Sequence, residues 1–171
     1  MFYGSQVFRI FPTHPARFET KKALLTRLPP RYRSAIHVLS LRLGPGWSKP
    51  PKVWNTGPKL GLADCTAVRR LNIFIELDPS GDIFKGFRVD DRWYTVFSGH
   101  LLEELLEQMP GIREVKFEAV PSVAKDGVLM TDLVAIAEVE NKKIIWGHHF
   151  VESSKEKCDL TMAAMMADLR L

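Results

Sequence analysis

The feature that most constrains this fold is one apolar pattern that occurs three times along the chain. The three segments read Ile36-x-x-Leu39-x-Leu41, Val68-x-x-Leu71-x-Ile73 and Ile112-x-x-Val115-x-Phe117. Each segment follows a helix end or a turn and lies in a short apolar run, which is typical of a buried β-strand. Alternate residues of a strand face opposite sides, so the last two apolar positions of each segment point into one core.

Amphipathic segments between these strands predict helices. The predicted strands are 6–11, 36–43, 68–77, 112–120 and 143–146, and the predicted helices are 15–28, 91–109, 127–141 and 155–170. Pro29-Pro30 ends the first helix, and Asp126 caps the third. The alternation predicts a single α/β domain over residues 1–171, with a small, mainly parallel sheet and helices on one side. The Met-rich helix at about 155–170 ends the domain.

The repeated pattern also matches the start of a leucine-rich repeat, in which one apolar residue closes a turn and two others enter the core. The three segments begin 32 and 44 residues apart, whereas ordinary repeats of this kind recur every ~20–29 residues. We therefore predict an irregular leucine-rich-repeat-like fold. An ordinary three-layer α/β sheet is the alternative.

Longer phrases carry a resemblance to a known group of proteins: RFETKKALLTRLPPRYRSAIHVLSLRLGPGW, LGLADCTAVRRLNIFIELDPSGDIFKGFRV and LLEELLEQMPGIREVKFEAVPSVAKDG. Over residues 2–147 the chain resembles a widespread filamentous-fungal family. In that family an F-box-like segment leads, through a phrase like Phe2–Phe8, into an irregular leucine-rich-repeat-like region. The resemblance implies a target-recognition domain related to ubiquitin-ligase adaptors. Met1 falls where the F-box-like segment should already have ended, so the docking half would be missing.

Composition excludes several classes of protein. The chain has 171 residues, 46% of them hydrophobic, including 4 Trp and 10 Phe, which argues against intrinsic disorder. No apolar run reaches the ~18 residues of a membrane span, and the first residues lack the apolar core of a signal peptide. The distant Cys65 and Cys158 form no metal or redox motif. We expect an intracellular protein, cytoplasmic or nuclear, without a cofactor.

Charge is distributed unevenly along the chain. Residues 1–60 hold eleven Lys and Arg residues and one acid, whereas residues 61–171 hold thirteen Lys and Arg residues and nineteen acids. A basic segment attracts nucleic acid, so a nucleic-acid-binding domain is an alternative function. Its candidate residues are Lys21, Lys22, Arg27, Arg31 and Arg33.

The alternation of the strands also predicts which side chains face away from the core. These are His37, Ser40, Arg42, Arg70, Asn72, Phe74, Glu76, Glu114, Lys116 and Glu118. Such a mixed polar and charged row favours a non-enzymatic protein-interaction domain. Trp47 and Trp54, with two lysines between them, form an aromatic and basic loop that suits stacking on nucleic-acid bases or anchoring a protein partner. Alternatively, the two indoles cover the end of the core.

Three remaining features concern chemistry and assembly. Asp78 and Asp82 follow a predicted strand and, with His148, define a second alternative, a small α/β enzyme with acidic residues at strand ends. The motif Asp78-Pro79-Ser80-Gly81 is also typical of a turn. His148 and His149 are adjacent and would face opposite sides of a strand, which disfavours a metal site. An exposed strand edge at Met1-Phe2 predicts a homo-oligomer as a further hypothesis.

Overall fold

The computed structural model describes residues 6–11, 23–44, 54, 56–77 and 93–150. The strands are β1 (Val7–Arg9), β2 (Val38–Leu43), β3 (Arg70–Ile75), β4 (Glu114–Ala119) and β5 (Lys143–Trp146). The helices are α1 (Leu24–Arg27), α2 (Pro30–Arg33), α3 (Trp93–Gln108) and α4 (Val128–Val139), with short 3-10 helices η3 (Pro58–Leu60) and η4 (Leu62–Asp64).

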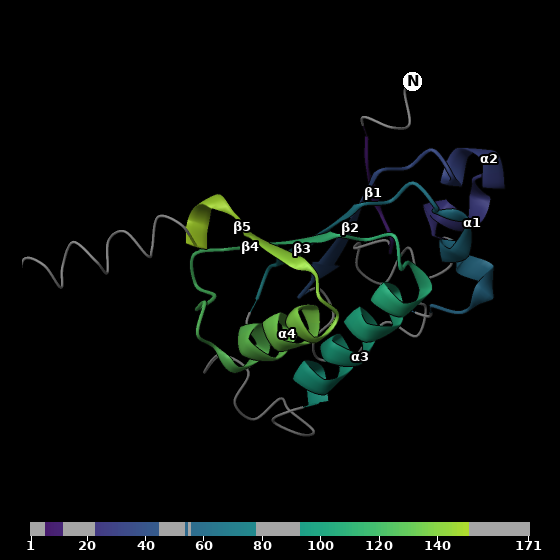
Figure 1. Cartoon of the computed structure of the whole chain (residues 1–171). Helices are drawn as coiled ribbons and strands as arrows, with labels where there is room; N and C mark the ends of the chain where they lie inside the picture. Colours follow the sequence, from purple (N-terminus) through teal and green to yellow (C-terminus); the bar gives the residue numbers. More distant parts are fainter. Residues whose placement is uncertain (1–5, 12–22, 45–53, 55, 78–92, 151–171) are drawn as a thin grey trace, which may run out of the picture.

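The five strands form one sheet in the order β1-β2-β3-β4-β5, and every neighbouring pair is parallel. This confirms the predicted α/β class. Parallel neighbours require a crossover connection between consecutive strands, and the helices between them provide that connection. Each strand after β1 pairs with the strand that precedes it in the sequence (Figure 1).

The repeated apolar pattern of the sequence coincides with the register of the sheet. Leu39, Leu71 and Val115 lie side by side on adjacent strands, as do Leu41, Ile73 and Phe117. All six side chains are buried, and so are Ile36, Val68 and Ile112 just before their strands. Equivalent positions of the pattern thus form ladders across β2, β3 and β4.

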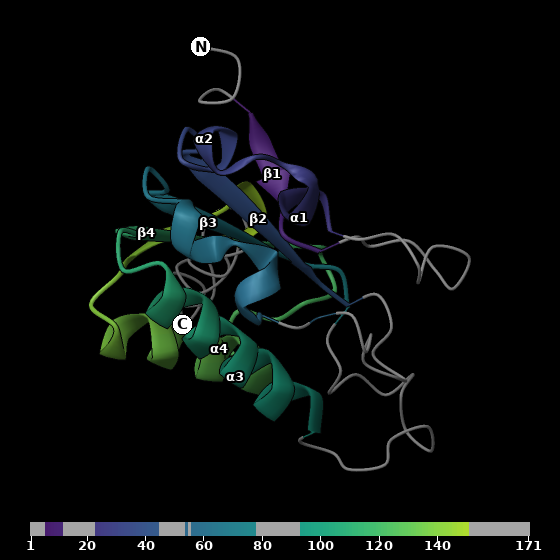
Figure 2. The ribbon, with the colours of Figure 1, turned by 90° about the vertical axis from the view of Figure 1, so that its right-hand side faces the viewer.

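The core lies between the sheet and the two long helices. Figures 1 and 2 show α3 and α4 side by side against one face of the sheet. Leu102 and Leu105 of α3, with Leu129 and Leu133 of α4, join the strand residues in one apolar cluster. The alternating strand positions, which point away from this cluster, are half-buried or exposed.

Two local predictions need correction. Gly127, not Asp126, is the N-cap of α4, and no side-chain hydrogen bond caps this helix end. The extended backbone of Gly127 turns the chain into the helix one residue later than predicted. Pro29-Pro30 follows the end of α1 as predicted, but the stretch before β2 contains the unpredicted helix α2, because Pro30 occupies its first position, where a missing N–H is tolerated.

Several predicted elements extend beyond the described residues. Of the predicted helix 15–28 the structure describes residues 23–28, which contain α1, and the tail helix at 155–170 lies outside the described part. Within the described part, no helix has the length and apolar character needed to cross a membrane.

Candidate functional site

The strongest candidate site is the face of the sheet opposite α3 and α4, which we call the polar face. It has three rows of residues that are paired in register on neighbouring strands between β2 and β5. One row is Ser40, Asn72 and Lys116, the second is Arg42, Phe74 and Glu118, and the third is Arg70, Glu114 and Lys143. Most of the predicted outward-facing residues therefore come together on one surface.

Charges of opposite sign are neighbours across this face. Arg70 Nη2 lies 2.7 Å from Glu114 Oε2, and Lys143 Nζ lies 3.6 Å from Glu114 Oε1. Lys116 Nζ lies 3.2 Å from Glu118 Oε2. The hydrogen bond from Arg70 lowers the pKa of Glu114 below its ordinary value, and the charges of Arg70 and Lys143 act in the same direction. The carboxylate therefore stays ionised to lower pH than an isolated glutamate.

Phe74 is the large apolar side chain of the second row, which lies at the carboxyl end of the strands. It is half-buried, and the guanidinium carbon of Arg42 lies 5.1 Å from its ring centroid. Arg42 also forms an ion pair with Glu76, which follows β3. Aromatic side chains, including phenylalanine, and arginine are enriched in protein interfaces relative to the rest of the surface. Phe74 and Arg42 therefore make the carboxyl ends of β2 and β3 the best anchor point of this face.

Asn72 adds an unsatisfied polar atom next to this anchor. Its Oδ1 atom is buried and accepts no hydrogen bond from the residues that the structure describes. A buried acceptor without a donor costs roughly 1–3 kcal/mol.

The structure revises the edge of the predicted surface. His37 is exposed but precedes β2, and Val38 instead pairs with Arg70 in the third row. The carbonyl of His37 accepts hydrogen bonds from the N–H groups of Arg69 and Arg70. Sequence analysis missed Lys143 and Ile145, although alternation within the correctly predicted strand 143–146 places both on this face.

Trp54 belongs to the core rather than to the polar face. Its side chain is 8% exposed and stacks on Phe11 at 5.3 Å and on Phe97 at 6.3 Å between ring centroids. A partner therefore has little access to this indole. Trp47 and Asp78, the other loop candidates, lie outside the described residues.

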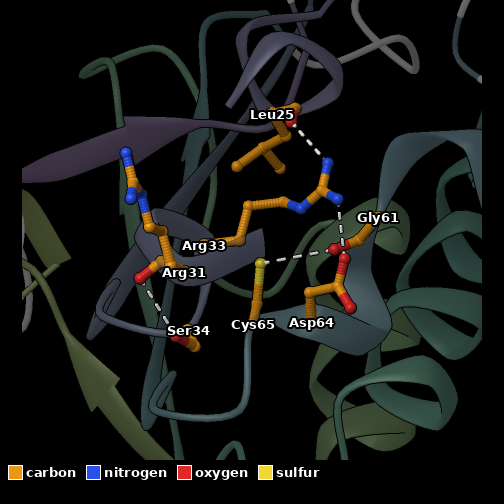
Figure 3. Close-up of polar contacts among 7 residues, drawn as sticks. All are labelled: Leu25, Arg31, Arg33, Ser34, Gly61, Asp64 and Cys65. Atoms are coloured by element: carbon orange, nitrogen blue, oxygen red, sulfur yellow. Dashed lines mark hydrogen bonds and ion pairs between the residues drawn. The ribbon is translucent and has the colours of Figure 1, made fainter. Parts of the chain in front are cut away.

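The basic residues of the nucleic-acid alternative are divided between two environments. Arg27 and Arg31 are exposed, whereas the Arg33 side chain is 13% exposed. Arg33 Nη1 donates to the carbonyl of Leu25 at 3.0 Å, and Nη2 lies 2.7 Å from Asp64 Oδ2 (Figure 3). Arg33 thus links α1, α2 and η4. Lys21 and Lys22 lie outside the described part of the chain.

Cys65 lies beside the same arginine and is buried. Its thiol donates to the Gly61 carbonyl, with 3.7 Å between Sγ and oxygen (Figure 3). Burial raises the pKa of the thiol to about 11, although the Arg33 charge opposes this shift. The thiol is therefore protonated at neutral pH, which fits a structural rather than a nucleophilic cysteine.

Of the three residues of the enzyme alternative, His148 alone lies in the described part of the chain. His148 is exposed, and Asp78 and Asp82 lie outside that part. Among the described residues, no group of three or more His, Cys, Asp or Glu side chains is placed to hold a metal ion.

The strand edge of the oligomer hypothesis is partly described. β1 is the first strand of the sheet, and its Val7 side chain is 55% exposed. Met1 and Phe2 lie outside the described residues, so homo-oligomerisation through this edge stays a prediction.

No protein-family profile, curated protein or solved structure matches this chain.

Proposed function

We propose that this chain is a non-enzymatic protein-interaction domain that recognises its partner through the polar face. The main support is the in-register row Arg42, Phe74 and Glu118, which combines a cation, an aromatic ring and an anion on the three middle strands of the sheet. Rigid strands hold these side chains in fixed relative positions. Such a surface suits the recognition of one specific protein.

The balance of charge on this face favours a protein over a nucleic acid. Arg42, Arg70 and Lys116 each have a glutamate partner, so the cations of this face are largely neutralised. Binding of a phosphate backbone depends on cations that are free to replace counterions. A protein surface that carries both signs of charge is the better complement.

The resemblance to the fungal F-box-like group provides a context for this proposal. In that context the domain is the target-recognition half of a ubiquitin-ligase adaptor, and its partner is the protein to be modified. The leucine-rich-repeat-like interpretation belongs to the same proposal. It rests on the apolar pattern that recurs across β2, β3 and β4.

The test compares the proteins that the full chain captures from a cell lysate with those captured by three variants, of which two are matched charge reversals. Glu118→Lys changes the polar face, whereas Glu107→Lys makes the same change on an exposed position of α3. Phe74→Ala removes the proposed anchor. Circular dichroism confirms that each variant is folded, and capture is repeated with nuclease and at high salt.

We expect the same proteins with the wild type and with Glu107→Lys, and their loss with Phe74→Ala and Glu118→Lys. Undiminished capture by both polar-face variants would contradict the proposal. Capture of nucleic acid that disappears at high salt, and that is weakened by Arg27→Ala and Arg31→Ala, would establish the nucleic-acid alternative instead.

A further inference from the structure

A cleft that is separate from the polar face lies where β4 and β5 end. It has a volume of about 630 Å3 and is lined by the loop after β4, the last residue of β5 and one side of α4. Open parallel sheets bind ligands at the carboxyl ends of their strands, because the loops there can vary without disturbing the core. Volumes of roughly 300–1,000 Å3 are typical of small-molecule sites.

Trp146 presents its indole to this cleft and is held by two other aromatic rings. Its centroid lies 5.9 Å from that of Phe117 and 5.4 Å from that of Phe150, with the second pair edge to face. Phe117 and Phe150 are fully buried. The indole is therefore held in position before any ligand arrives, which reduces the entropy lost on binding.

The indole already holds a cation. Lys125 Nζ lies 4.0 Å from the ring centroid of Trp146, within the range of a cation–π interaction. Lys125 is exposed and belongs to the loop after β4. Its long side chain can leave the ring without a change in the backbone, so an external cation can take its place.

The other walls of the cleft match a cation with an apolar surface. Glu138 of α4 contributes a carboxylate, and Val123 and Val134 contribute apolar contacts. A methylated or quaternary ammonium group is less strongly hydrated than a primary ammonium, so it loses less on entering such a cleft. Recognition of these groups by aromatic rings is well established.

We propose that this cleft binds a methylated or quaternary ammonium group on the Trp146 indole, and that Lys125 is an intramolecular competitor for the same position. The cleft has room for a larger molecule that carries this group. This site is independent of the polar face, and its test does not depend on the protein partner.

The test titrates the full chain with choline and follows the indole N–H signals by NMR. The chain has 4 Trp residues, and the spectrum of Trp146→Phe assigns the signal of interest. The neutral carbon analogue of choline, 3,3-dimethylbutan-1-ol, is the control for shape without charge. Sodium chloride at equal concentration is the control for ionic strength.

We expect choline, but not its neutral analogue, to shift the Trp146 signal. Lys125→Ser removes the competitor and should tighten choline binding by about tenfold, the scale of one partly desolvated cation–π contact. Glu138→Gln should weaken it several-fold. Glu140→Gln, an exposed change at the end of the same helix, should leave the affinity unchanged.

Three results would overturn the proposal. The first is equal binding of choline and its neutral analogue. The second is an unchanged affinity for choline in Lys125→Ser. The third is that choline shifts the Trp146 signal neither in the wild type nor in Lys125→Ser. If choline binds as expected, the next question is whether the ammonium group belongs to a modified protein or to a small molecule. A peptide with trimethyllysine, compared with the same peptide with unmodified lysine, distinguishes these two sources. Tighter binding of the methylated peptide than of choline assigns the site to a modified protein, and the reverse order assigns it to a small molecule.

Discussion

The backbone of Gly61 lies so close to the Arg33 guanidinium that a Cβ at position 61 would be 2.6 Å from Arg33 Cζ. Gly61 also has a φ of +75°, in the left-handed region that favours glycine. This approach allows Arg33 to reach both the Leu25 carbonyl and the Asp64 carboxylate. One glycine thus permits an arginine to join three elements that are separate in the sequence.

Gly61→Ala should therefore destabilise the protein by about 1–3 kcal/mol. Left-handed backbone costs roughly 1–2 kcal/mol for a residue with a Cβ, and displacement of the guanidinium adds to this cost. Urea unfolding measures the change. The control is Gly127→Ala, because Gly127 has a φ of −69°, which any residue adopts. Equal effects of the two substitutions would contradict this account.

The ion pair between Arg33 and Asp64 should show a measurable coupling energy. Arg33 is 13% exposed and Asp64 is 42% exposed, so the pair is intermediate between surface and buried ion pairs. A double-mutant cycle with Arg33→Ala and Asp64→Ala should give about 1 kcal/mol. Arg31→Ala, an exposed change on the same helix, should alter stability by less than about 0.5 kcal/mol. Strict additivity in the cycle would exclude an energetic role for the pair.

The raised pKa of the Cys65 thiol predicts a loss of stability at alkaline pH. Burial raises the pKa of its thiol from 9.0 to about 11 in the folded state, so the folded state holds the proton more tightly. The stabilisation is fully present below pH 9.0 and is lost as the pH rises towards 11. The slope approaches about 1.4 kcal/mol per pH unit in that window.

The measurement compares urea unfolding of the wild type and Cys65→Ala at pH 8 and pH 10.5. Other titrating groups contribute equally to both proteins and cancel in the difference. The wild type should lose more stability than the variant between the two pH values. Parallel pH profiles would show that the thiol does not titrate with an altered pKa.

The lowered pKa of Glu114 predicts a loss of stability at acidic pH. Its pKa lies below its ordinary value, mainly because Arg70 Nε donates a hydrogen bond to Oε2 at 2.9 Å. Its contribution to stability is therefore present above the ordinary pKa of glutamate and is lost as the pH falls through the lowered value. NMR titration of the side-chain carboxyl should show a higher pKa in Arg70→Ala. Lys59→Ala removes a charge from η3, which packs against α1 rather than β4, and should not alter this pKa.

The sequence determined the strands and their core-facing residues. The apolar pattern of Leu39, Leu71 and Val115 reappears as one ladder across three strands. This was predictable because burial on one face of a strand requires an apolar residue at every second position. The helices α3 and α4 were predictable from apolar residues that recur with the helical period, although the cap of α4 was not, as Gly127 demonstrates.

Only the tertiary structure decided which polar residues meet. Arg70 pairs with Glu114, 44 residues away, because the register of two strands brings them together. The burial of Trp54 and the contact between Lys125 and Trp146 likewise depend on how distant segments pack. Alternation assigns a residue to a face, but its neighbours on that face depend on strand order and register. The physical reason is that polar contacts leave no periodic signal in the sequence, whereas the hydrophobic core does.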